Sequence, residues 1–130
     1  MLILTIRTDN PVAEIGLYQD GRQVDYVKWD ADRKLAETIH QQIQNLLVKN
    51  NQSLDKLEGL GVYEGPGSFT GLRIGLSVAN ALAASLKIPI VSSTGDDWTE
   101  QSEQKLSDGQ NETVALPEYG ALPNITSPRK

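Results

Sequence analysis

The sequence contains no cysteine and a single histidine, and these absences exclude several classes of protein. Without cysteine the chain has no disulfide framework, no cysteine-ligated zinc or iron–sulfur cluster, and no cysteine nucleophile. One histidine, His40, argues against a zinc site built from protein ligands alone. Scattered serines and that histidine do not form a nucleophile–base pair. We therefore predict no catalytic residues and no metal site.

Basic residues are also in deficit, with 12 Lys and Arg against 17 Asp and Glu and a net charge of −5. Phosphate contacts need clustered Lys and Arg, so the composition argues against direct nucleic-acid binding by the chain alone. Residues 1–7 have neither a basic leader nor a long apolar run. We therefore expect no signal peptide, no membrane span and a cytoplasmic location.

Hydrophobic periodicity predicts an α/β domain. Short apolar runs indicate strands, and apolar positions spaced by three and four indicate helices. The predicted order is strand, strand, strand, helix, strand, helix, strand, helix, at residues 2–6, 12–18, 24–29, 32–49, 60–63, 70–86, 88–91 and 96–106. The alternation implies right-handed crossovers and a mixed five-stranded sheet covered by helices.

Local signals mark the limits of these elements. Asp20-Gly21 predicts a two-residue hairpin turn between the second and third strands, and Asp32 is expected to cap the first helix. Residues 1–106 form the predicted domain. The polar, proline-containing residues 107–130 are predicted to be a flexible or loosely docked tail.

Six of the eleven glycines fall between Gly59 and Gly75, where a predicted strand meets a predicted helix. A helix N-terminus presents free N–H groups and favours anions, so this turn is a candidate phosphate-binding loop. Its candidate anion-binding residues are Gly65, Gly67, Ser68 and Thr70. The spacing matches neither the Walker A motif nor the dinucleotide fingerprint, and Glu64 places a negative charge beside the loop. Nucleotide binding is therefore kept as an alternative.

The helix predicted at 70–86 is apolar on nearly every side, with Arg73 as its only charged residue. Such a helix must be covered on all sides, and the sheet of a small domain covers one of them. Small residues at every fourth position allow another backbone to approach closely; they are Gly71, Gly75, Ala79 and Ala83. An uncovered apolar helix face is typical of an interface. We therefore predict assembly with another protein through this face.

The run Gly-Pro-Gly-Ser-Phe-Thr-Gly-Leu-Arg-Ile-Gly at residues 65–75 closely resembles the signature of the TsaB (YeaZ) family of tRNA threonylcarbamoyladenosine synthesis proteins. Residues 53–59 and 79–91 are also similar, and the resemblance covers residues 2–94. It implies the actin-like ATPase (ribonuclease H-like) fold, which agrees with the predicted strand and helix order. It also implies a non-catalytic scaffold that holds a TsaD-like transferase in an active state, with a TsaE-like ATPase joining them.

The resemblance also implies a partner interface on the helices at 35–47 and 71–86. The implied residues are Leu35, Ile39, Ile43, Leu46, Gly71, Leu72, Arg73, Gly75, Leu76, Ala79 and Ala83. The resemblance also implies that homodimers can form through the same helices. No cofactor is expected on this chain, and any ATP would belong to the complex with the partner. Two alternatives stay open: a nucleotide-binding fragment that uses residues 65–71, and a specialised copy that only homodimerises.

The sequence departs from the family pattern at three places. The family's first strand usually ends Asp-Thr-Ser/Thr, whereas Arg7-Thr8-Asp9 stands here, and the lost carboxylate argues against nucleotide hydrolysis. The His-x-x-x-His metal pair of TsaD is absent, and we interpret His40 as a boundary or surface histidine. The chain also ends before a second domain of similar fold, so we do not expect the interdomain cleft in which this fold binds nucleotides.

Overall fold

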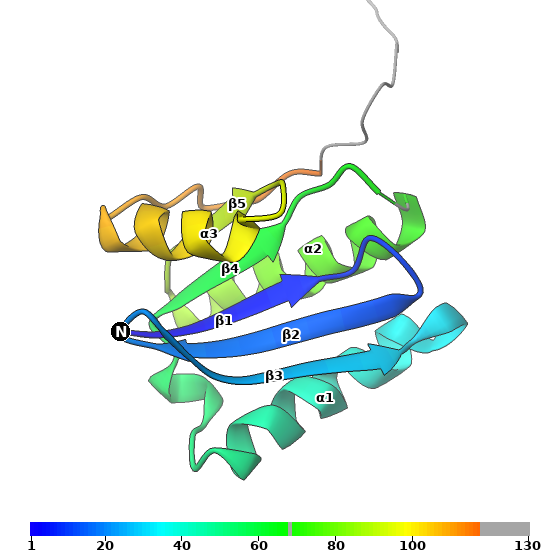
Figure 1. Cartoon of the computed structure of the whole chain (residues 1–130), viewed down its shortest axis with the longest axis horizontal. Helices are drawn as coiled ribbons and strands as arrows, with labels where there is room; N and C mark the ends of the chain where they lie inside the picture. The colour runs from blue at the N-terminus through cyan, green and yellow to red at the C-terminus, as the bar shows by residue number, and fades with distance from the viewer. Residues whose placement is uncertain (68, 118–130) are drawn as a thin grey trace, which may run out of the picture.

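The computed structural model describes residues 1–67 and 69–117, and within them five strands form one mixed sheet (Figure 1). The strands are β1 (Leu2–Arg7), β2 (Val12–Gln19), β3 (Arg22–Asp30), β4 (Gly59–Tyr63) and β5 (Ile90–Ser93). The α-helices are α1 (Leu35–Lys49), α2 (Phe69–Leu86) and α3 (Trp98–Ser107), with short 3-10 turns at Asp32–Lys34 and Leu54–Lys56. The predicted α/β architecture with a mixed five-stranded sheet is confirmed.

The strand directions follow from the connections between strands, and the sheet order is β3-β2-β1-β4-β5. β1, β2 and β3 pair antiparallel through short turns. Asp20 and Gly21 have φ angles of 53° and 82°, as a two-residue hairpin turn requires. β1 pairs parallel with β4, and β4 with β5, and parallel neighbours need crossovers, which α1 and α2 provide. The carboxyl ends of β1, β4 and β5 therefore meet at one end of the sheet.

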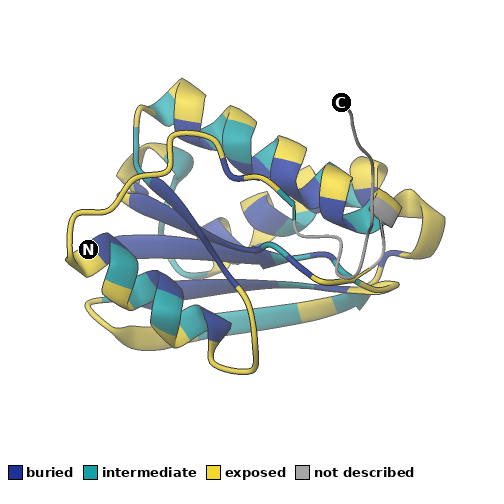
Figure 2. Ribbon diagram, turned by 90° about the horizontal axis from the view of Figure 1, so that it is seen from above, coloured by how far each residue is buried: buried dark blue, intermediate teal, exposed yellow. Residues whose placement is uncertain are grey.

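Helices cover both faces of the sheet, with α1 and α2 on one face and α3 on the other (Figure 1). Burial is concentrated on the strands and on the inner sides of the helices (Figure 2). The main core lies between the sheet and the α1–α2 layer and includes Leu4, Ile6, Ile15, Ile39 and Leu72. On the other face, a Cβ on Gly61 would lie 2.6 Å from the Ser102 Cβ, so glycine lets α3 approach β4 closely.

The start of α1 differs from the prediction. Asp32 has a φ of 45° and begins the 3-10 turn rather than capping the helix. Its backbone N–H donates to the Pro11 carbonyl at 3.2 Å, which ties the residue to the β1–β2 connection. An N-cap needs a different backbone conformation, typically extended. Lys34 takes the N-cap position without a side-chain cap hydrogen bond, so the prediction that Asp32 caps α1 is wrong.

The segment that follows α3 packs on the domain. Residues 108–117 return past β5 and α2, and Ala115 is 1% exposed and belongs to the main core. The predicted tail begins at residue 107 and is either flexible or loosely docked; Ser107 ends α3, and residues 108–117 are docked on the domain. The remainder of the predicted tail, 118–130, lies outside the described residues. None of the described helices has the length and apolarity that crossing a membrane requires.

Candidate functional site

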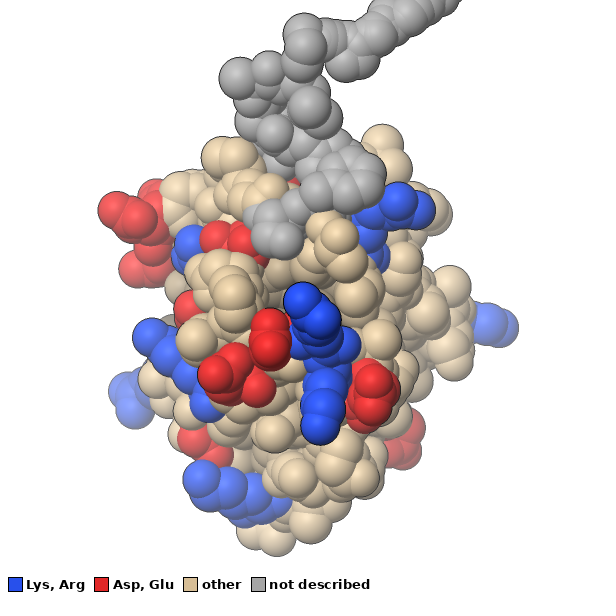
Figure 3. All heavy atoms as spheres, turned by 90° about the vertical axis from the view of Figure 1, so that its right-hand side faces the viewer, with Lys and Arg blue, Asp and Glu red and all other residues tan. Residues whose placement is uncertain are grey.

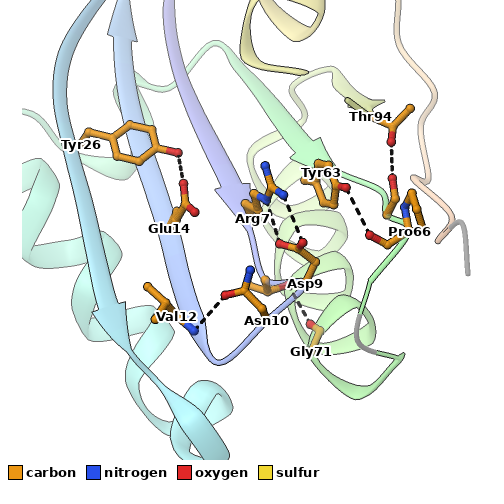
Figure 4. A network of polar contacts seen from close by, with 12 residues as sticks. Arg7, Asp9, Asn10, Val12, Glu14, Tyr26, Tyr63, Pro66, Gly71 and Thr94 are labelled. Carbon is orange, nitrogen blue, oxygen red and sulfur yellow. Dashed lines mark hydrogen bonds and ion pairs between the residues drawn. The ribbon is translucent and has the colours of Figure 1, made fainter. Parts of the chain in front are cut away.

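The glycine-rich loop lies at the end of the sheet where β1, β4 and β5 terminate (Figure 4). Arg7, the last residue of β1, forms a two-point ion pair with Asp9. The Arg7 Nε donates to Asp9 Oδ1 at 2.8 Å, and a terminal nitrogen donates to Oδ2 at 3.1 Å. The guanidinium carbon lies 4.0 Å from the ring centroid of Tyr63 at the end of β4. The hydrogen-bonded Asp9 carboxylate raises the pKa of Arg7 further above its usual range, so Arg7 is held charged and fixed in place.

Side chains from neighbouring strands hold the loop against this ion pair. The Tyr63 hydroxyl donates to the Pro66 carbonyl at 3.2 Å, and the Thr94 hydroxyl donates to the Gly65 carbonyl. Asp9 lies directly against Gly67, because a Cβ on that glycine would be 2.3 Å from the Asp9 Cβ. The glycine at position 67 is therefore explained by contact within the chain.

This packing does not fit the nucleotide that the fold family implies. A phosphate cradle needs free N–H donors and positive potential. Here the Asp9 side chain, which carries a carboxylate, fills the space beside Gly67. Figure 3 views this end of the molecule, where basic and acidic side chains are interspersed and neither sign dominates.

The predicted anion-binding residues are distributed differently around the loop. Gly65 is buried, Gly67 and Thr70 are exposed, and Ser68 lies outside the described residues. Thr70 belongs to the first turn of α2. Across residues 1–67 and 69–117, no group of three His, Cys, Asp or Glu side chains lies close enough together to hold a metal ion.

Most of the predicted interface residues lie inside the chain. The nine buried ones belong to α1 and α2 and are Leu35, Ile39, Ile43, Leu46, Leu72, Gly75, Leu76, Ala79 and Ala83. Gly71 is half-buried and Arg73 is exposed. The predicted contact surface is corrected accordingly: an apolar helix side suits a core and an interface equally well, and here the chain's own fold covers it.

The small residues of α2 serve a contact within the chain. The Thr8 hydroxyl, which follows β1, donates to the Gly71 carbonyl at 2.7 Å. A Cβ on Gly75 would lie 2.1 Å from Thr8 Oγ1 and 2.9 Å from Thr8 Cγ2. The absence of a side chain at Gly75 thus lets α2 approach the end of β1. At Gly75, Thr8 occupies the space predicted to admit a partner's backbone.

The helix face carries a surface groove on its outer side. This groove, with a volume of about 450 Å³, lies between α1 and α2. It is lined by Ala36, His40, Thr70, Arg73, Ile74, Ser77 and Val78. A neighbouring hollow of about 390 Å³ shares Thr70 and Ile74 and extends to Asn10 and Pro11. The two hollows together follow the junction of the two helices to the β1–β2 connection.

Arg73 is the one predicted interface residue that lines this groove. The other residues that line the groove could have been found by examining the outward-facing positions of both helices. Ala36 and His40 are one turn apart on α1 and exposed, and Arg73 and Ser77 stand in the same relation on α2. A search for apolar positions overlooks them because they are small or polar. The exposure of His40 confirms its interpretation as a surface histidine.

Comparison with known proteins identifies the family to which the chain is similar. The family model described as "TsaD: tRNA N6-adenosine threonylcarbamoyltransferase" matches residues 29–93, which is half of the chain. The chain is 32% identical over 91 residues to the tRNA threonylcarbamoyladenosine biosynthesis protein TsaB of Escherichia coli K12, covering 70% of this chain and 39% of that protein. It is 35% identical over 107 residues to the tRNA N6-adenosine threonylcarbamoyltransferase of Geobacter metallireducens, covering 70% of this chain and 31% of that protein.

A crystal structure agrees with these sequence matches. It is that of a Pseudomonas aeruginosa protein with similarity to peptidase YEAZ, and it superposes with a TM-score of 0.67 and 25% identity. The superposition covers 72% of this chain and 43% of that one.

The fold is that of an actin-like, ribonuclease H-like α/β domain, as the resemblance predicts. The chain belongs to the TsaD/TsaB (YeaZ) family, which confirms the resemblance found in residues 65–75. The chain spans 39% of the length of the E. coli relative and 31% of the Geobacter relative. The activities and partners of those whole proteins therefore do not follow from family membership alone.

Proposed function

We propose that this chain takes part in tRNA threonylcarbamoyladenosine biosynthesis as a non-catalytic scaffold subunit. In this proposal it binds a TsaD-type transferase through the outer groove between α1 and α2 and holds that enzyme in its active state. The observation that carries the proposal is the groove itself, which lies on the helix face that the family resemblance implicates. The names of the matched relatives support the pathway.

The lining of the groove suits a partner helix. Ile74 and Val78 are half-buried and offer apolar contact, while exposed Ala36 and Ser77 are small enough for close approach. His40 adds a polar group on the α1 side. Two helix pairs that meet in this way would bury on the order of 800 Å² per partner, the size of a standard specific interface.

The closed corner of the sheet supports a chain without nucleotide chemistry of its own. The Arg7–Asp9 pair is packed on Gly67, and the Asp9 carboxylate beside the loop is adverse to a phosphate. Any ATP of the assembly would then be bound by the partner complex, with a TsaE-like ATPase joining it. A homodimer through the same groove is the alternative state of the free subunit.

Substitution of groove residues tests the proposal. Ser77→Arg and Ala36→Arg place a long charged side chain on opposite walls of the groove, so we expect each to weaken binding of a TsaD-type protein at least about tenfold in calorimetry. Ser107→Arg is the matched control, because Ser107 is an exposed helical serine on α3, across the sheet. It should bind like the unaltered chain, and thermal melting of each variant checks the fold.

The outcomes separate the alternatives. Undiminished binding by both folded groove variants would refute the groove as the docking site. A homodimer is detected by light scattering without partner, and the two groove variants should then be monomers while Ser107→Arg stays dimeric. Titration with ATP and magnesium is expected to give no binding heat, and a clear heat would instead favour the nucleotide-binding fragment.

A further inference from the structure

The outer edge of β5 is closed by side chains and by the segment that follows α3. β5 is the last strand of the sheet on its side. The Ile90 N–H donates to Asn111 Oδ1 at 3.1 Å, and the Ile90 carbonyl accepts from the Glu112 N–H at 2.8 Å. The Ser92 N–H donates to Glu112 Oε2 at 2.7 Å, and the Ser92 carbonyl accepts from Lys105 Nζ at 2.5 Å. All four backbone groups of these two residues are therefore paired without a further strand.

The same segment is anchored to α2. The Asn80 side-chain nitrogen donates to the Ala115 carbonyl at 3.0 Å, and the Asn80 side-chain oxygen accepts from the Ala115 N–H at 2.8 Å. The Ser92 hydroxyl adds a bond to Glu112 Oε1 at 2.7 Å. Residues 111–115, called the edge strap below, are thus fixed at both ends, and buried Ala115 adds an apolar contact.

At the opposite edge of the sheet, a side chain also accepts a hydrogen bond from a backbone N–H of the edge strand. β3 is the edge strand there, and its Tyr26 N–H donates to the carboxylate of neighbouring Asp25 at 2.8 Å. Asn50, at the end of α1, donates to the same carboxylate at 2.9 Å and holds it in place. Unpaired strand edges are templates for pairing with other chains, and side chains that occupy the edge groups prevent it.

We propose that the edge strap caps β5 against pairing with a second copy of this chain, so that association is confined to the helix face. A second copy is the natural occupant of an opened edge, because β5 is uncharged and the same N–H and C=O groups would be presented by both copies. The strap provides this protection with the side chains of Asn111 and Glu112 and the Glu112 N–H, and Lys105 of α3 covers the fourth edge group.

The cap can be removed at its two attachment points. Glu112→Ala removes the acceptor for the Ser92 N–H, and Asn80→Ala releases Ala115. Glu112→Gln is the matched control, because its side-chain oxygen can still accept that hydrogen bond. Glu100→Ala is a second control that removes an exposed glutamate from α3.

Native-state hydrogen exchange measures the cap directly. In Glu112→Ala and Asn80→Ala, exchange at Ser92 and Ile90 should rise at least about fivefold relative to the β1 amides of the same variant. The two controls should stay near the unaltered chain. Sedimentation velocity should show concentration-dependent self-association when Glu112→Ala is added to Ser77→Arg, a variant in which the groove cannot pair. Comparison within each variant removes the effect of lower overall stability.

Unchanged relative exchange at Ile90 and Ser92 would overturn the proposal, as would an opened edge that leaves the Ser77→Arg/Glu112→Ala protein monomeric at every concentration. Binding of a TsaD-type partner by Glu112→Ala, measured beside Ser77→Arg, separates this result from the proposed function. The edge cap can fail while the groove still binds the partner, and the groove can fail while the edge cap stays intact.

Discussion

Gly75→Ala tests whether the small residues of α2 serve the chain's own packing. A Cβ at this position would lie 2.1 Å from Thr8 Oγ1, 2.9 Å from Thr8 Cγ2 and 3.0 Å from Thr8 Cβ. Such distances cannot be relieved by rotating a flexible chain end, because all three atoms belong to a short β-branched side chain that is 2% exposed. Either Thr8 or α2 must move.

Three contributions set the size of the effect. Alanine favours the helix over glycine by about 1 kcal/mol. Loss of the bond from the Thr8 hydroxyl to the Gly71 carbonyl costs about 1 kcal/mol. Overpacking of a well-packed core costs about 1–3 kcal/mol. The first two offset each other, so we expect Gly75→Ala to lower the free energy of unfolding by about 1–3 kcal/mol and the thermal midpoint by several degrees.

Urea denaturation of four proteins provides the assay: the unaltered chain, Gly75→Ala, Thr8→Ala and the double variant. Thr8→Ala removes Oγ1 and Cγ2, the two nearest of these atoms, and keeps only Cβ at 3.0 Å, so the double variant should recover stability, with a coupling free energy of about 1 kcal/mol or more. Ser77→Ala on the same helix is the control and should change stability by a few tenths of a kcal/mol. A Gly75→Ala protein as stable as the original would refute the assignment of this stripe to internal packing.

Two further predictions concern pH. The hydrogen bond from Asn50 and then that from the Tyr26 N–H lower the pKa of Asp25, so its contribution to stability is present above about pH 4 and is lost as the pH falls below that value. The difference in urea midpoint between Asp25→Asn and the unaltered chain should therefore shrink from pH 7 to pH 3, and an equal difference at both values would contradict this role. Burial, followed by the charge of Glu100, raises the pKa of Glu103, whose Oε2 is buried without a hydrogen-bond partner among the described residues. Glu103→Gln should raise the thermal midpoint at pH 7, with the gain fading as the pH falls through the raised pKa toward the ordinary glutamate value, and a lower midpoint at pH 7 would count against it.

The order of elements was predictable from the sequence because it depends on local chemistry. Period-two and period-3.6 apolar patterns, together with Asp20-Gly21, define strands, helices and the hairpin within a few residues. The alternation of strands and helices after residue 30 then leaves few topologies, because crossovers are right-handed. The run at residues 65–75 was specific enough to indicate the family.

The site could be predicted only in part. The assignment of a partner interface to α1 and α2 stays a prediction, and the structure adds to it the groove between their outer sides. The sequence could not show that the Asp9 side chain, paired with Arg7, would pack against Gly67, because Asp9 and Gly67 lie in two loops 58 positions apart. It also could not show that Asn111 and Glu112, which have the composition of a loop, would complete a sheet edge.

The sequence by itself determined which positions of α2 are apolar and which are small, because side-chain identity and helical period need no further information. The tertiary structure alone decided what covers them: Leu72 and Gly75 face the sheet and Thr8, while Ser77 and Arg73 face the groove. The physical reason is that apolar burial is non-directional, so an apolar helix side is stabilised equally by its own sheet or by another protein. Only the packing of segments distant in the chain selects between the two.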